Sequence, residues 1–274
     1  MAAPLNVVDK PDLKGVRAKI NRAKHHFEQI DTAVRHLFIN ADTTTAAPYY
    51  NMDRQELVLA WEKTTPVDPT LPLLAGDCIH NARSALDHLV FQLAVLNHAP
   101  REAAKKTSFP VYLTPAEFKN AVRGKIAPFI SGNALAEIEK LQPYAAANAG
   151  ADDIIWVLSQ LDIIDKHRLL IVTASKFRPT AFTVTAPSGH EFSTEIPSGP
   201  WKPSERGTEV LRFDLSKAVT QPGKVNVKVN AARTVQIEKT GLICDGMILQ
   251  AVLHDSILFV ENIVGSFGRL FFSE

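Results

Sequence analysis

The side chains best suited to chemistry are concentrated in one predicted helix, residues 71–96. They are Asp77, His80, Asn81, Arg83, Ser84, Asp87 and His88. Lys and Glu, which usually cover solvated helix faces, are absent from this row, and the second half of the helix is apolar on almost every face. If the row is exposed, it is a solvated helix face. If it is buried, its polar groups must be paired, so it is either a satisfied structural network or a functional site.

A second polar cluster ends another predicted helix, residues 152–165, which is otherwise almost entirely apolar. Its members are Asp162, Asp165, Lys166, His167 and Arg168. Positive charge at the C-terminus of a helix is favourable, which accounts for the basic residues. Asp162 is different, because its apolar neighbours predict burial and a buried carboxylate needs a cation or a donor. Arg83 or a histidine of the 71–96 helix is the natural partner, and if the two clusters meet, the site holds several carboxylates, histidines and arginines.

Three chemistries fit the combined cluster. The spacing Asp77-x-x-His80 is that of di-iron sites in helical bundles, and it suggests a metal-dependent hydrolase. Its alternative metal ligands would be Asp77, His80, His88, Asp165 and His167. A histidine oriented by a carboxylate can perform general acid–base catalysis. An arginine and a histidine can together cleave a phosphodiester, because a guanidinium matches phosphate and an imidazole titrates near neutrality.

The segment Arg83-Ser-Ala-Leu-Asp-His88 resembles the R-x4-H motif of the HEPN family, helical-bundle proteins that include many metal-independent ribonucleases. The resemblance implies that Arg83 holds the scissile phosphate and that His88 acts on the ribose 2′-hydroxyl, leaving a 2′,3′-cyclic phosphate. It implies no cofactor. The family usually places a polar residue such as Asn directly after the arginine, where this chain has Ser84.

A longer pattern, Gly-Asp-x-x-His-Asn-x-Arg-Ser-Ala-Leu-Asp-His followed later by Asp-Lys-His-Arg, is similar to uncharacterised bacterial and phage-associated proteins. That similarity implies a shared fold, but it gives no information about activity. The predicted catalytic residues are Arg83, His88, Asp87, His80 and Asn81. The residues expected to support them are Asp77, Ser84, Asp162, Lys166 and Arg168. The alternative is a non-enzymatic binding or interaction protein in which the polar row is a buried network.

RNA is the predicted partner, contacted by the basic side chains of a first helix, residues 13–40. That helix also carries an apolar seam with alternating spacings of four and three, which could pair two copies in a homodimer. The net charge of the chain is +1, so no global charge commits it to nucleic acid or membrane. No run reaches the ~18 apolar residues of a membrane span, and no secretion signal is evident. Cys78 and Cys244 look like core residues of predicted helices, which favours a reducing, cytoplasmic location.

The elements that must position these residues indicate an α+β protein, a helical bundle with an antiparallel β region inserted before the C-terminal helix. Further helices are predicted at 133–141 and 242–272, and a short one follows the capping box Thr114-Pro-Ala-Glu117. Strands are predicted at 55–61, 169–173, 181–186, 191–196, 209–215, 225–229 and 234–238, with a hairpin turn at 187–190. We expect residues 1–168 and 241–274 to form the helical domain, and residues 169–240 to form a β region packed on or beside it.

Overall fold

The computed structural model describes residues 11–39, 46–51, 56–61, 67–145, 153–174, 178–185, 191–195, 209–214, 226–232 and 234–273. The chain divides into two compact units. Unit 1 comprises Met1–Asp31, Pro69–Ile171 and Ile237–Glu274, and unit 2 comprises Thr32–Asp68 and Val172–Gln236. Helices dominate the first unit and strands the second, so the chain is a helix-rich α+β protein. None of the helices in the described ranges combines the length and the apolarity needed to cross a membrane.

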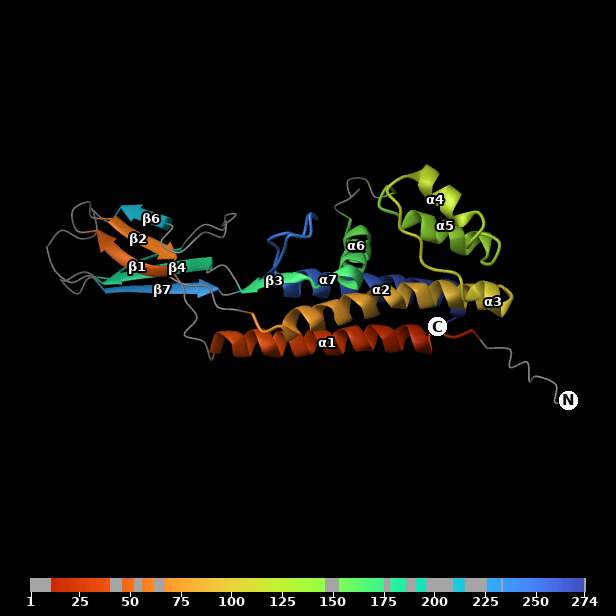
Figure 1. Ribbon diagram of the computed structural model, residues 1–274, viewed down its shortest axis with the longest axis horizontal. Helices are drawn as coiled ribbons and strands as arrows, with labels where there is room; N and C mark the ends of the chain where they lie inside the picture. Colours follow the sequence, from red (N-terminus) through yellow and green to blue (C-terminus); the bar gives the residue numbers. More distant parts are fainter. Residues whose placement is uncertain are drawn as a thin grey trace. The chain divides into compact units, whose positions relative to one another are not determined.

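Three long helices lie side by side: α1 (Lys14–Ile39), of which residues 14–31 belong to unit 1, α2 (Thr70–Leu96) and α7 (Leu249–Phe267) (Figure 1). The predicted seam of α1 is buried, with Val16, Ile20 and Ile30 at most 4% exposed. The thiol of Cys78 on α2 donates to the Ala23 carbonyl of α1 over 3.4 Å, so the seam faces α2. The expectation that this seam joins two copies is therefore corrected, because the seam already packs within one chain.

One face of α2 is buried along the whole helix. Its apolar residues are at most 2% exposed, and they include Cys78, Ile79, Ala82, Leu86, Leu89 and Leu93. An α-helix repeats every 3.6 residues, so these positions share one side, and burying that side against α1 and α7 stabilises unit 1. Polar residues are left on the remaining two sides of α2, which face different neighbours.

The predicted C-terminal helix begins later than expected, at Leu249, and ends in a π-helical turn, Gly268–Phe272. A turn precedes it, in which the Asp245 carboxylate accepts hydrogen bonds from the backbone and hydroxyl of Thr240 and from the Gly241 backbone. Gly241 and Gly246 have φ of 76° and 80°, a conformation outside the helix. Cys244 is buried in this turn, rather than in a helix as predicted.

Four further helices complete the described part of unit 1: α3 (Arg101–Ala104), α4 (Pro115–Val122), α5 (Gly132–Lys140) and α6 (Ile154–His167). The predicted capping box is confirmed, because the Thr114 hydroxyl accepts from the Glu117 backbone over 3.3 Å. The Asp153 carboxylate caps α6 in the same way, over 2.8 Å to the Ile155 backbone. The α6 helix packs across α2 (Figure 1).

Unit 2 contains two three-stranded sheets. In the first, β1 (Ala46–Asn51) pairs with β2 (Glu56–Trp61), and β2 pairs with β6 (Glu209–Asp214). In the second, β4 (Arg178–Thr185) lies between β5 (Glu191–Glu195) and β7 (Asn226–Ala232). All the described pairings in these two sheets are antiparallel.

The sheet of β1, β2 and β6 corrects the predicted domain division. Residues 32–68 group with the β region rather than with the helices, because β2 pairs with a strand about 150 residues later. The predicted hairpin turn at 187–190 lies outside the described residues. A separate pair of strands, β3 (Ile171–Ala174) and β8 (Val235–Glu238), contains two of the four points at which the chain passes from one unit to the other.

Candidate functional site

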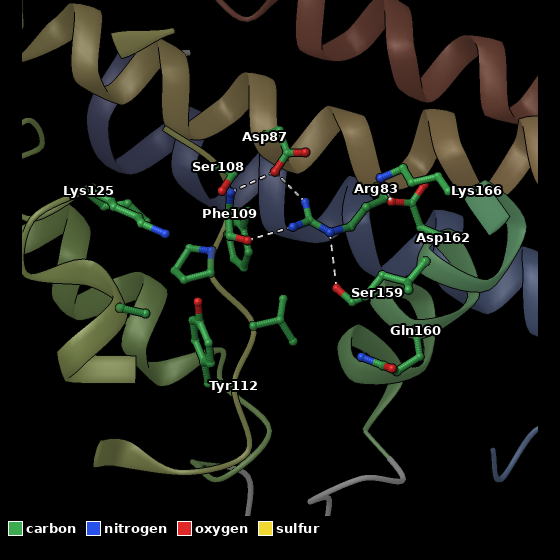
Figure 2. Close-up of a pocket in the computed structure, with 15 residues that line it drawn as sticks. Arg83, Asp87, Ser108, Phe109, Tyr112, Lys125, Ser159, Gln160, Asp162 and Lys166 are labelled. Carbon is green, nitrogen blue, oxygen red and sulfur yellow. Dashed lines mark hydrogen bonds and ion pairs between the residues drawn. The ribbon is translucent and has the colours of Figure 1, made fainter. Parts of the chain in front are cut away.

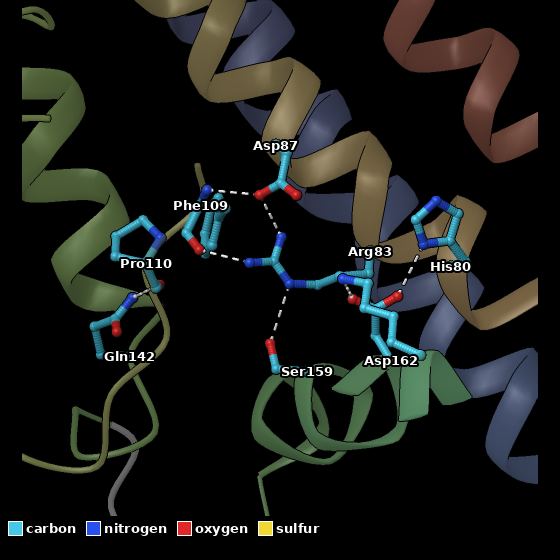
Figure 3. Close-up of polar contacts among 9 residues, drawn as sticks. His80, Arg83, Asp87, Phe109, Pro110, Gln142, Ser159 and Asp162 are labelled. Atoms are coloured by element: carbon cyan, nitrogen blue, oxygen red, sulfur yellow. Dashed lines mark hydrogen bonds and ion pairs between the residues drawn. The ribbon is translucent and has the colours of Figure 1, made fainter. Parts of the chain in front are cut away.

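Arg83 is the centre of a hydrogen-bond network between α2, α6 and the extended segment at 108–112 (Figures 2 and 3). Its guanidinium donates to the Asp87 carboxylate over 2.6 Å, to the Phe109 carbonyl over 2.7 Å and to the Ser159 hydroxyl over 3.2 Å. The Phe109 backbone N–H donates in turn to Asp87 over 2.8 Å. With its side chain only 13% exposed, Arg83 fixes the 108–112 segment to α2 and α6.

Gln142 holds the same segment from its other side. This residue is 1% exposed, and its amide nitrogen donates to the carbonyls of Pro110 and Ile138 over 2.9 and 3.1 Å. Its amide oxygen accepts from the Tyr112 backbone over 3.1 Å. The extended segment lacks a strand partner, so these side chains satisfy the backbone groups that a sheet would otherwise pair. The result is a rigid wall between α2, α5 and α6.

The two predicted polar clusters do meet, at Asp162. Its carboxylate side chain is 6% exposed, lies 3.0 Å from the His80 ring and accepts from the Lys166 ammonium over 2.5 Å (Figure 3). Burial of Asp162 and its pairing with a histidine of the central helix are thus confirmed. His80 and Lys166 are about half exposed, so the Lys166 ammonium neutralises the buried carboxylate and the His80 ring pairs with it while both keep contact with water.

Asp165 lies against the backbone of α2 at Gly76. A Cβ atom placed on Gly76 would overlap the Asp165 carboxylate, so only glycine leaves room for this approach. Burial, with the neighbouring carboxylates of Asp162 and Asp77, raises the pKa of Asp165 above its ordinary value, and His80 opposes this effect. The close packing of α2 and α6 at Gly76 therefore places the Asp165 carboxylate where its ionised form is disfavoured.

Two further residues of the predicted row, Asn81 and His88, lie on the side of α2 that faces α1. Lys19 of α1 donates to the Asn81 side chain over 3.3 Å, and Asn81 donates to the Asp77 carbonyl over 2.8 Å. His88 is exposed, 3.7 Å from where a Cβ would stand on Gly15 of α1. Burial lowers the pKa of His88 first, and the Lys19 charge adds to the decrease, whereas Asp87 acts in the opposite direction.

Arg83 and His88 therefore do not converge within one chain. Five residues of α-helix separate them by about 140° around the axis, and their side chains contact different neighbours. Arg83 reaches Ser159 and Phe109, whereas His88 lies beside α1. Within one chain, the two groups therefore do not face the common pocket that joint action on one phosphodiester would need.

The other predicted residues occupy varied positions. Ser84 is half-buried, Asp77 is exposed, and His167 and Arg168 are exposed at the C-terminal end of α6. Of the alternative metal ligands, Asp77 and His80 lie near enough to Asp165 to influence its pKa. Within the described ranges, no group of three or more His, Cys, Asp or Glu side chains is arranged to hold a metal ion.

A pocket of about 370 Å³ lies where the Arg83 network meets the Asp162 cluster (Figure 2). Arg83, Asp87, Gln160, Asp162 and Lys166 line it from α2 and α6. Lys125, in the turn after α4, and Tyr112 reach toward the same space from the opposite wall (Figure 2). Among the described residues, neither the Lys125 ammonium nor the Tyr112 hydroxyl has a hydrogen-bond or ion-pair partner.

Sequence reasoning missed Ser159, Gln142, Tyr112 and Lys125. Ser159 had a signal, because it is a polar residue in a helix that is otherwise almost entirely apolar. Gln142, between Leu141 and Pro143, had a weaker signal of the same kind. Lys125 and Tyr112 had none, since their importance comes from the pocket that the fold creates.

Comparisons with known proteins find no relative of this chain. No family model matches the chain, and no curated protein or solved structure is significantly similar to it.

Proposed function

We propose that unit 1 is a binding protein whose pocket takes a small ligand carrying a negatively charged group. The observation that carries this proposal is the charge pairing in the pocket walls. Arg83 is paired with Asp87, and Lys166 is paired with Asp162. Lys125 lines the same pocket without a carboxylate partner in the described part of the chain. A ligand anion would supply the missing partner.

The polar network supports binding rather than catalysis. Three of the five N–H donors of Arg83 are directed to Asp87, Ser159 and Phe109, so its guanidinium shapes the wall of the pocket. None of the described residues that line the pocket is a histidine, the side chain most often used for proton transfer near neutral pH. A network that is already satisfied holds the walls in place before the ligand arrives, which lowers the entropy cost of binding.

The proposal is tested by titrating the full-length protein with benzoate and with inorganic phosphate, followed by NMR. We expect at least one of these anions to shift the signals of pocket residues, and Lys125→Gln to weaken that binding about tenfold. Lys119→Gln is the matched control, because Lys119 is an exposed lysine on α4 that does not line the pocket. The proposal fails if neither anion shifts pocket signals, or if Lys125→Gln and Lys119→Gln behave alike.

The ribonuclease predicted from the R-x4-H resemblance remains a separate proposal, and the same protein tests it. Total RNA is incubated with the wild type, Arg83→Ala and His88→Ala in EDTA. A binding protein leaves the RNA intact in all three samples. Cleavage by the wild type that both variants lose would replace our proposal, and it would require His88 and Arg83 from two different copies of the chain.

A further inference from the structure

The pocket has two walls of different character. The wall formed by α2 and α6 carries charged and amide groups, including Arg83, Asp87 and Gln160. The facing wall carries the apolar side chains of Val111, Ala121 and Ile126 beside the polar ends of Lys125 and Tyr112. Ile163 adds a further apolar side chain that is 47% exposed, so a ligand covering it would remove hydrocarbon from water. The contrast fits a ligand with one polar end and one apolar body.

The charges of the lining residues favour a ligand anion that carries a single negative charge. Lys125, Arg83 and Lys166 carry three positive charges, and Asp87 and Asp162 carry two negative charges, so one positive charge is left over. A carboxylate matches that charge. A phosphate monoester carries about 1.5 to 2 negative charges near neutral pH, and its excess would be repelled by the two wall carboxylates.

From these two features we infer that the pocket binds a monocarboxylate with an apolar body, such as a small aryl or alkyl carboxylate. The Lys125 ammonium and the Tyr112 hydroxyl donate to the carboxylate, and Val111, Ile126 and Ile163 cover the body. A volume of about 370 Å³ is at the low end for ligand sites, which suits a small molecule. The inference rests on the proposed function and specifies its ligand class.

Calorimetric titration of the full-length protein with four probes tests this assignment. Phenylacetate has both features, acetate lacks the body, phenylacetamide lacks the charge, and phenyl phosphate carries additional charge. We expect phenylacetate to bind at least tenfold more tightly than each of the other three. Tyr112→Phe should weaken phenylacetate binding several-fold and Lys125→Gln about tenfold, with Lys119→Gln unchanged.

The outcomes separate the two proposals. If phenyl phosphate binds as tightly as phenylacetate in a Lys125-dependent manner, the carboxylate assignment is wrong and anion binding stands. If phenylacetamide binds as tightly as phenylacetate, the role of Lys125 and the proposed function are both wrong. If acetate equals phenylacetate, the apolar wall is not part of the site. Thermal melting of each variant checks that it is folded, as expected for the exposed Lys125 and the half-buried Tyr112.

Discussion

The two polar sides of α2 differ in how completely their groups are paired. On the side facing α6, Arg83 and Asp87 are joined to each other, to Ser159 and to the Phe109 backbone. On the side facing α1, the contacts are fewer and His88 is exposed. A motif that is continuous in the sequence is thus divided between a structural network and a solvated edge.

This difference shows that the spacing of motif residues on a helix determines which face of the helix each side chain occupies. Residues three or four apart share a face, as Arg83 and Asp87 do, whereas residues five apart do not. The ion pair of Arg83 with Asp87 is the natural consequence of their spacing. We therefore expect the two sides to respond differently when their residues are replaced.

The largest effect is expected from Arg83→Ala. The change removes three hydrogen bonds, leaves the Phe109 carbonyl unpaired and leaves Asp87 with the Phe109 N–H but without its cation, so unit 1 should lose about 2–4 kcal/mol of unfolding free energy. His88→Ala should cost less than about 0.5 kcal/mol, because His88 is exposed. Native-state hydrogen exchange of the α2 amides reports unit 1 alone. Equal costs for the two variants would contradict the comparison.

The next largest effect is expected when both side chains that pair with Asp162 are removed. His80→Ala or Lys166→Ala alone leaves one partner, and should cost less than about 1 kcal/mol. The double variant leaves a carboxylate with a 6% exposed side chain unpaired, and should cost about 2–3 kcal/mol. A double-mutant cycle by the same exchange measurement tests this non-additivity. Simple additivity would mean that Asp162 finds another partner.

A smaller effect, of opposite sign, is expected for Asp165→Asn. The pKa of Asp165 is raised in the folded protein from its ordinary value of 3.8, mainly by burial and then by Asp162 and Asp77. Its charge therefore destabilises unit 1 once the pH exceeds the folded pKa. At neutral pH the variant should be more stable by less than about 1 kcal/mol, because the group is half-buried. The gain should vanish below pH 3.8, and a gain that persists there would contradict this origin.

The smallest effect is expected on the α1 side. Lys19→Gln removes a positive charge that lowers the pKa of His88, so the pKa of His88 should rise toward its ordinary value of 6.5. The exposed His254 on α7, distant in sequence, serves as the control within the same NMR titration. An unchanged His88 titration would show that Lys19 does not face it.

The sequence allowed α1, α2 and α6 to be predicted within a few residues, because periodicity and capping are local, whereas the start of α7 was predicted too early. Burial of Asp162 also followed from its apolar neighbours. The pairing of β2 with β6 could not be predicted, since strand partners distant in sequence leave no local pattern. The partner of Arg83 at Phe109 is a backbone carbonyl, which every residue carries, so no residue type signals it. The angular separation of Arg83 and His88, by contrast, follows from helix geometry and was predictable.

The contact between Cys78 and Ala23 has a practical consequence. Burial raises the pKa of the Cys78 thiol to about 12, so the nucleophilic thiolate is scarce while α1 covers it. An alkylating reagent such as N-ethylmaleimide can react at this position only after α1 moves away from α2. The rate at which Cys78 is modified, measured by mass spectrometry, therefore reports how often α1 separates from α2.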